Sequence, residues 1–472
     1  MVRNASKGII RISENNPHYF EYKGKEILLI TSAEHYGEVI SRKFDYVKYF
    51  DMLAEYGLNY TRVYPGAIVQ PSNYWLSEDM MAPGENVIVP WARSNVPGYI
   101  NGGNKFDLNT WDGEYFARLR DLLTEADKRN IIAEICFFNC MQGKYLENSP
   151  LYKDNNIQEI GNCDRIGFQT LDDQALVQEQ LKYIEKIIME TNDFDNILYE
   201  FVDEPTTVLT PSHKAYHWID RQIETAIETE SRLPKKHMLA QQLEIGVNFA
   251  DDDRVANIVT QYVSMSWRQV GGIPALDNCY CFNKPVELNE TAYVGSWLKE
   301  TDDLVSVSRL EAWEFMIGGG AGFNQLNGYY QVSNPSGESP INRKILAGLR
   351  NLRTFLENFE FVKMTRDTET VRSVSVGASV NMISEKGRQY AMYIHHSFPV
   401  FRNNSYYEPN YGSYEPVLAL LLPEGRYTGS FIEPETLKVL NEINIISCGG
   451  ETKIACPCYT LDLAVKIIAD RM

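Results

Sequence analysis

The chain has 472 residues, 44% of them apolar, and its 45 basic and 63 acidic residues give a formal net charge of −18. This composition predicts an acidic globular protein with a large core, and it argues against nucleic-acid binding, which needs a basic surface. No apolar run reaches the length of about 18 residues that crosses a bilayer, and no hydrophobic signal core follows Met1. We expect neither nucleic acid nor membrane as partner. The localisation stays open between the cytoplasm and, where a signal has been removed, the periplasm or exterior.

The eight cysteines are too sparse for a disulfide scaffold. Cys279 and Cys281, like Cys456 and Cys458, are spaced C-x-C, and neither pair has the neighbouring ligands of a zinc site. We therefore expect free thiols, no metal and no cofactor.

Residues 26–360 alternate between short β-branched or aromatic runs and longer amphipathic runs, a pattern typical of parallel strands with crossover helices. The predicted strands are residues 26–32, 59–64, 131–138, 196–202, 237–243, 257–263, 285–289 and 322–326. The predicted helices are residues 43–56, 113–130, 172–191, 212–232, 308–317 and 342–359. This order predicts an α/β fold, a (β/α)₈ TIM barrel, because no G-x-G-x-x-G follows the first strand as it would in an open doubly wound sheet.

Two other segments flank the predicted barrel. Before it, residues 18–22 and 26–30 surround Lys23-Gly24-Lys25, which is a hairpin signal. From residue 365 the pattern changes to period-two strands without helices, at residues 371–376, 380–384, 390–395, 417–422, 427–432 and 461–468. We expect two domains, a catalytic barrel with an N-terminal β-hairpin over residues 1–362 and a small antiparallel β-sandwich over residues 363–472.

Acidic residues follow two of the predicted barrel strands, at the carboxyl ends where active sites of this fold lie. Residues 196–205, NILYEFVDEP, end in Asp203 and Glu204, and residues 284–290, KPVELNE, end in Glu290. Glycosidic bond cleavage needs two such carboxyls. A separation of about 5–5.5 Å between them gives retention of the anomeric configuration, and one of about 6.5–9.5 Å gives inversion. Because a single acid at a strand end is more often a helix cap or an ion pair, the hypothesis depends on their combination.

These runs resemble segments of clan A glycoside hydrolases, particularly cellulase-like family 5 and apiosidase-like members. Residues 196–205 look like the fourth strand of that clan, whose Asn-Glu-Pro ending carries the acid/base, and residues 284–290 look like its seventh strand, whose terminal Glu is the nucleophile. Residues 59–63, NYTRV, resemble the second strand with its sugar-site Arg, and residues 309–323 resemble the segment from helix to eighth strand. The resemblance spans residues 20–360, and the β-rich tail matches the sandwich that such enzymes often append.

The resemblance implies a retaining glycoside hydrolase acting on an oligo- or polysaccharide by double displacement, with Glu204 as acid/base and Glu290 as nucleophile. Candidate substrate-binding residues are Arg62, Asp203, His35, Tyr262, Trp297 and Asn139. A lone His or Tyr at a strand end is as often a satisfied core group.

Two departures from the clan pattern bear on the substrate. Asp203 stands where the clan usually has an Asn that bonds the sugar 2-OH, and residues 324–327 lack the Trp that often floors the first subsite. An ionised Asp203 accepts a hydrogen bond from a sugar hydroxyl and disfavours a substrate carboxylate, so we expect a neutral sugar. In the alternative, Arg62 neutralises Asp203, which then only orders the strand ends.

Other functions fit the sequence less well. A non-catalytic carbohydrate-binding protein on a degenerate barrel would keep aromatic loops at residues 66–112 and 140–171 but lose a catalytic Glu, and both Glu residues are present. A metal-dependent hydrolase would need H-x-H or H-E-x-x-H ligands, and the seven His residues show neither at a strand end. No G-x-S-x-G elbow or P-loop supports an esterase or an NTPase.

Overall fold

The computed structural model describes residues 5–33, 36–69, 86–139, 145–205, 212–244, 246–261, 272–291, 302–375, 377–402 and 405–470. Three predicted site residues, His35, Tyr262 and Trp297, lie outside these described residues. Within them, no helix combines the length and the apolar character that a bilayer crossing requires.

Eight parallel strands form the barrel sheet, in the hydrogen-bonded order β4-β13-β12-β11-β10-β9-β8-β5. Their bounds are β4 (Leu29–Ile30), β5 (Tyr60–Val63), β8 (Ile132–Phe138), β9 (Ile197–Val202), β10 (Leu239–Gln242), β11 (Asn257–Gln261), β12 (Val286–Glu290) and β13 (Gly322–Phe323). From β5 to β13 each barrel strand pairs with the next barrel strand of the chain, and β13 pairs with β4, as a (β/α)₈ barrel requires. The predicted fold is confirmed.

Side chains join the first two barrel strands, which stand at the two ends of this order. Asn59 donates to the Leu28 carbonyl over 2.9 Å and accepts from the Ile30 amide over 3.1 Å. The Tyr49 hydroxyl donates to the Ala33 carbonyl over 2.8 Å, which ties the first helix to the end of β4. Between β4 and β5 the side-chain amide of Asn59 therefore takes the place of the backbone hydrogen bonds that join the other barrel strands.

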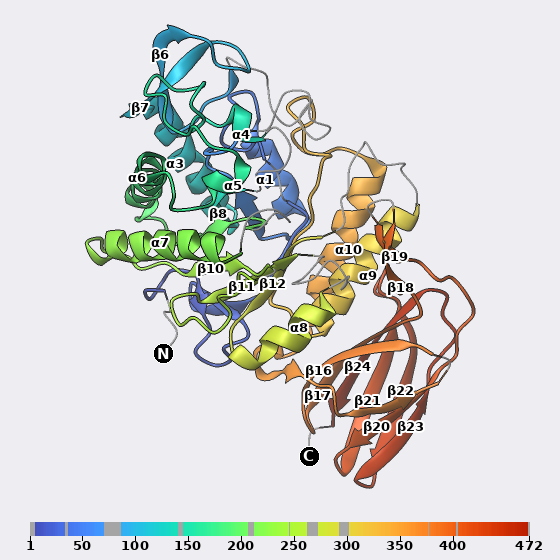
Figure 1. Cartoon of the computed structure of the whole chain (residues 1–472). Coiled ribbons are helices and arrows are strands. Elements are labelled where there is room, and N and C mark those ends of the chain that lie inside the picture. The colour runs from blue at the N-terminus through green and yellow to red at the C-terminus, as the bar shows by residue number, and fades with distance from the viewer. Residues whose placement is uncertain are drawn as a thin grey trace.

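Helices surround the strands (Figure 1). The longer ones are α1 (Tyr46–Glu55), α3 (Gly113–Lys128), α6 (Gln174–Thr191), α7 (Ser212–Ser231), α8 (Ile273–Cys279), α9 (Asp302–Ile317) and α10 (Pro340–Glu357). The short ones are α4 (Tyr145–Asn148), α5 (Arg165–Phe168), η2 (Tyr280–Phe282) and η3 (Phe361–Lys363). Side-chain caps determine where several helices begin. Asp112 before α3 and Asp173 before α6, for example, each accept hydrogen bonds from two backbone N–H groups. In α6, Leu176, Tyr183 and Ile187 share the buried face that its helical spacing predicts.

The amino ends of the barrel strands are closed by the N-terminal segment. Its sheet contains β1 (Arg11–Ile12), β2 (Phe20–Tyr22) and β3 (Lys25–Ile27), and Lys23 and Gly24 turn between the last two with φ of 50° and 75°. Ile10 and Phe20 belong to the same apolar cluster as residues inside the barrel strands, including Ile132. The predicted single strand 26–32 is wrong, because residues 25–27 pair with the hairpin and only Leu29–Ile30 enters the barrel.

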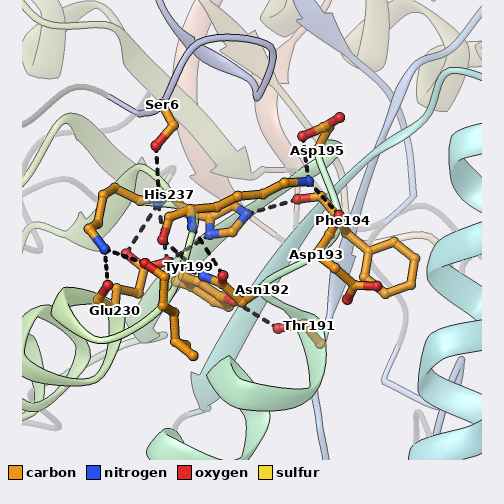
Figure 2. A network of polar contacts seen from close by, with 12 residues as sticks. Ser6, Thr191, Asn192, Asp193, Phe194, Asp195, Tyr199, Glu230 and His237 are labelled. Carbon is orange, nitrogen blue, oxygen red and sulfur yellow. Dashed lines mark hydrogen bonds and ion pairs between the residues drawn. The ribbon is translucent and has the colours of Figure 1, made fainter.

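Figure 2 shows a polar network at the same amino ends. The Nδ1 of His237 lies 2.7 Å from Glu230, and its Nε2 lies 2.9 Å from the Phe194 carbonyl. Tyr199 shares a hydrogen bond of 2.7 Å with Thr191 at the end of α6. Because these groups satisfy one another, the network fixes helix ends against β9 and β10, which is a stabilising role.

Part of the long segment 66–112, predicted as a loop, forms an antiparallel hairpin of β6 (Trp91–Pro97) and β7 (Asn104–Trp111). Its aromatic residues mostly face inward: Trp91 lies 5.2 Å from the ring of Tyr183, and Tyr99 is buried against Phe106. Phe168, in the other aromatic segment, is also buried. These rings hold the loops on the barrel, so their faces are not open to a sugar.

The C-terminal part is an antiparallel sandwich, drawn in red in Figure 1. One sheet has the order β14-β16-β17-β24-β21-β22 and the other the order β15-β20-β23, with a separate β18-β19 hairpin. The bounds are β14 (Thr365–Arg366), β15 (Val371–Val374), β16 (Ser379–Glu385), β17 (Gln389–His395), β18 (Phe398–Arg402), β19 (Ser405–Glu408), β20 (Val417–Leu422), β21 (Gly425–Ile432), β22 (Val439–Ser447), β23 (Gly450–Ala455) and β24 (Asp462–Ala469). The predicted sandwich is confirmed, although β14, β18, β19, β22 and β23 were not predicted.

The central strands of the six-stranded sheet, β17 and β24, are buried on both faces. In β17, Tyr390 and Met392 point into the sandwich core, whereas Ala391 and Tyr393 join the core of the barrel side. The Tyr393 ring stacks on Trp313 of α9 at 5.6 Å. Beside it, Arg309 of α9 pairs with Asp462 over 2.8 Å, and both side chains are at most 6% exposed. An aromatic stack and a buried ion pair therefore join the barrel to the sandwich.

This junction gives a test of stability. We expect Asp462→Ala to lower the free energy of unfolding by about 3–5 kcal/mol, because it leaves the buried Arg309 without its close partner. Glu435→Ala is the matched control, since Glu435 pairs with the same Arg309 but is 63% exposed, and it should cost less than about 1 kcal/mol. Urea unfolding measures both, and equal losses would contradict the role assigned to the buried pair.

Candidate active site

Arg62 of β5 is the centre of the polar groups inside the barrel mouth. Its side chain is completely buried. The guanidinium donates to Glu200 from two nitrogens, over 2.8 and 2.7 Å, and to Asp203 over 3.1 Å. Its third nitrogen lies 3.9 Å from the carboxylate of Glu290. One cation is therefore shared by three carboxylates, two from the β9 segment and one from β12.

Glu290 is the last residue of β12, and only 3% of it is exposed. The pairing of β12 with β11 shifts register just before it, where Leu288 faces Thr260 and Glu290 faces Gln261. This irregularity changes the period-two alternation at the carboxyl end of the strand. The structure thus brings Glu290 and Arg62 together at the carboxyl ends of β12 and β5.

Glu204 lies just beyond β9 and is half-buried. Its backbone is in the left-handed region, with φ of 47°, and its N–H donates to the side-chain oxygen of Gln242 over 2.8 Å. A non-glycine residue held in this region costs about 1–3 kcal/mol and is found disproportionately at functional sites. The position of Glu204 at the barrel mouth is therefore imposed by its surroundings, with Gln242 of β10 as one fixed contact.

Asp203 is buried, and both its backbone and its side chain form hydrogen bonds. Its N–H donates to the Phe138 carbonyl over 2.8 Å, and its carboxylate accepts from Arg62. This ion pair is the alternative that the sequence left open, in which Arg62 neutralises Asp203 and the pair orders the ends of β8 and β9. Asn139, the remaining predicted sugar contact, follows β8 and is buried.

A second polar layer lies deeper in the barrel. Tyr60, two residues before Arg62 on β5, contacts Glu134 of β8 and donates to Glu287 of β12 over 3.2 Å. All three side chains are fully buried. Burial, together with the negative charge of Glu200, raises the pKa of Glu287 to about 8. Burial and the charges of Glu200 and Glu287 raise the pKa of Glu134 well above its usual range.

Sequence reasoning gave no role to Glu134, Glu200 or Glu287. The available signal was a lone carboxyl inside an apolar strand, as in IIAEICFF at residues 131–138 and ILYEFV at 197–202. Such a residue must find a partner or a proton when it is buried. The sequence could not identify Arg62 as the partner of Glu200, because these two residues are 138 positions apart in the chain. The described residues contain no group of three or more His, Cys, Asp or Glu that could hold a metal ion.

No protein-family model and no curated protein sequence matches the chain. Solved structures do match. A protein from Bacteroides vulgatus ATCC 8482, provisionally described as a glycoside hydrolase, has a TM-score of 0.65 at 12% identity over 98% of this chain and 82% of its own. A structure described as a glycoside hydrolase gives 0.64 at 10% identity over 98% and 97% of the two chains. A family 5 glycoside hydrolase from the same Bacteroides strain gives 0.60 at 12% identity over 98% and 94%. The resemblance to glycoside hydrolases is thus confirmed in the fold, barrel and sandwich together.

The shared guanidinium leads to a stability prediction. Arg62→Met should lower the free energy of unfolding by about 3–5 kcal/mol at neutral pH, because it leaves three buried carboxylates without their cation. Burial raises the pKa of Glu200, and without the guanidinium this carboxyl binds a proton more readily in the folded variant than in its unfolded chain, so the deficit should shrink as the pH falls from 7 to 5. Denaturant unfolding at both pH values measures this.

The matched control is Arg42→Met, which removes a pair with Glu114 whose members are 37% and 64% exposed. It should cost less than about 1 kcal/mol at either pH. A deficit for Arg62→Met that is no larger than that of the control, or that grows on acidification, would contradict the account.

Proposed function

We propose that this protein is a retaining glycoside hydrolase that cleaves O-glycosidic bonds by double displacement. The observation that carries the proposal is the pairing of Glu290 at the end of β12 with the buried guanidinium of Arg62, in a barrel whose β9 leads into Glu204. A nucleophilic carboxylate must be ionised when it attacks the anomeric carbon, and an adjacent cation favours the ionised form. The glycoside hydrolases among the structural neighbours support the same activity.

In the proposed reaction Glu204 first acts as an acid and then as a base. It protonates the leaving oxygen while Glu290 forms the bond to the anomeric carbon, and it then takes a proton from the water that releases the sugar from Glu290. A half-buried position suits this exchange, because the carboxyl must reach both the leaving group and the incoming water. The fixed contact from its backbone to Gln242 holds the segment during both steps.

We propose a neutral sugar at the cleavage site of an oligo- or polysaccharide. Glu200, Asp203 and Glu290 share one cation, so the described part of the mouth carries excess negative charge. A substrate carboxylate would add to that charge, whereas sugar hydroxyls can donate hydrogen bonds to it.

The role of Glu204 can be tested with aryl and alkyl glycosides of neutral pyranoses. Glu204→Ala should lower kcat/KM on alkyl glycosides by about 10²–10⁴, because their leaving groups need a proton. Dinitrophenyl glycosides should be affected much less, since their leaving group departs without one, and added azide should speed their turnover. Equal losses on both substrate classes would argue against an acid/base role.

The nucleophile can be identified by trapping it. A 2-deoxy-2-fluoro glycoside with a dinitrophenyl leaving group should inactivate the enzyme, and fragment-ion mass spectrometry should place the label on Glu290. Glu290→Gln is the control and should take no label. A label on Glu287, three residues earlier on β12, would show that the wrong acid has been chosen. Binding of sugars without hydrolysis or labelling would favour the carbohydrate-binding alternative.

A further inference from the structure

Among the described residues, the polar groups inside the barrel include more acids than the one guanidinium of Arg62 can balance. Glu200, Asp203 and Glu290 all contact Arg62, whereas Glu134 and Glu287 form no ion pair within the described residues. Ionised carboxylates without a cation are very costly to bury, and the usual outcome is that they keep their protons.

The contacts of the Tyr60 hydroxyl also indicate that one of these carboxyls is protonated. Its hydroxyl contacts a carboxyl oxygen of Glu134 and one of Glu287, but it has only one proton to donate. The second contact becomes a hydrogen bond when one of the two carboxyls is protonated and donates to the phenol oxygen. The cluster is therefore complete with at least one neutral carboxyl.

The strand beside Glu287 is shaped to hold its side chain. A Cβ atom on Gly322 of β13 would lie 2.4 Å from Cγ of Glu287, so only glycine leaves room for the carboxyl at this position. Among the described residues, the charged and titratable groups that face Glu287 are Tyr60 and Arg62 of β5, Glu134 of β8 and Glu200 of β9. From β11 it is approached by Asn257, which does not titrate.

We propose that Glu287 is a positioning residue that stays protonated beneath the site. Because its carboxyl is neutral, the guanidinium of Arg62 interacts with the carboxylates nearer the barrel mouth. When Glu287 loses this proton, a new negative charge competes for Arg62 from below. The contact between Arg62 and Glu290 then weakens. The inference rests on the proposed function only where activity is measured.

The first experiment needs no substrate. Glu287→Gln keeps the shape of the neutral carboxyl but cannot ionise. The stability that the proton contributes in the wild type is complete below the unfolded pKa, about 4.3, and is lost as the pH rises through the folded pKa of about 8. The folding equilibrium constant of the wild type, relative to that of Glu287→Gln, should therefore fall about tenfold per pH unit between pH 5 and 8.

Infrared spectroscopy of the wild type provides a second measurement that does not depend on the variant folding. A carboxylic acid C=O band should be present at pH 7 and decline by pH 9, and in Glu287→Gln this pH-dependent band should be missing. Parallel stability curves for wild type and Glu287→Gln, or an infrared band unchanged between pH 7 and 9, would overturn the proposal.

The third experiment links the proton to catalysis. With a dinitrophenyl glycoside, whose departure needs no general acid, kcat/KM of the wild type should fall about tenfold from its plateau by pH 9, whereas Glu287→Gln should stay flat. Glu230→Gln, at the opposite end of the barrel, should retain the wild-type decline (Figure 2). Superimposable profiles of wild type and Glu287→Gln would refute the link to Arg62. A complete lack of activity would count against the proposed function, while the first two measurements would still decide where the proton is.

Discussion

A single buried guanidinium organises the carboxyl end of this barrel. Arg62 extends from β5 to carboxylates of the β9 segment and of β12, strands that are not its neighbours in the sheet. Burying an arginine costs several kcal/mol unless its N–H groups form hydrogen bonds. Here the two carboxylate oxygens of Glu200 accept two of these bonds. The positions of Asp203 and Glu290 depend on this contact, because both approach the same cation from different strands.

The excess of acid around that cation connects stability with chemistry. Well-packed apolar groups are often at least as stabilising as buried charged groups, and the described residues place Glu134, Glu200, Asp203, Glu287 and Glu290 around the one guanidinium of Arg62. The protein keeps the polar interior, and burial shifts the deeper carboxyls toward their neutral forms. Functional sites commonly retain such costly groups because they fix the charge of the residues that react. In the proposed function, the neutral layer below leaves the positive charge of Arg62 directed toward Glu290.

Patterns local in sequence predicted most of the fold, and they placed the proposed catalytic acids at strand ends. Buried parallel strands are apolar runs, so the barrel and the acids at the ends of β9 and β12 could be recognised from the sequence. Partners distant in sequence could not. Neither the bond from Arg62 to Glu200 nor the burial of Trp91 leaves a local pattern, and exposed edge strands such as β22 have too few buried residues to show alternation. The strand predicted at residues 26–32 was split because two sheets compete for it.

Buried polar side chains lie at both ends of the barrel. At the amino ends, an apolar cluster fills the interior and His237 is bonded through both ring nitrogens. Toward the carboxyl ends, the side-chain amides of Asn289 and Gln242 have donors without a protein partner among the described residues, although both residues are buried. Unsatisfied buried donors are expensive and uncommon in native proteins. In the proposed function, hydroxyl groups of the bound sugar would accept hydrogen bonds from these two amides, because both lie beside the strand ends that carry Glu204 and Glu290.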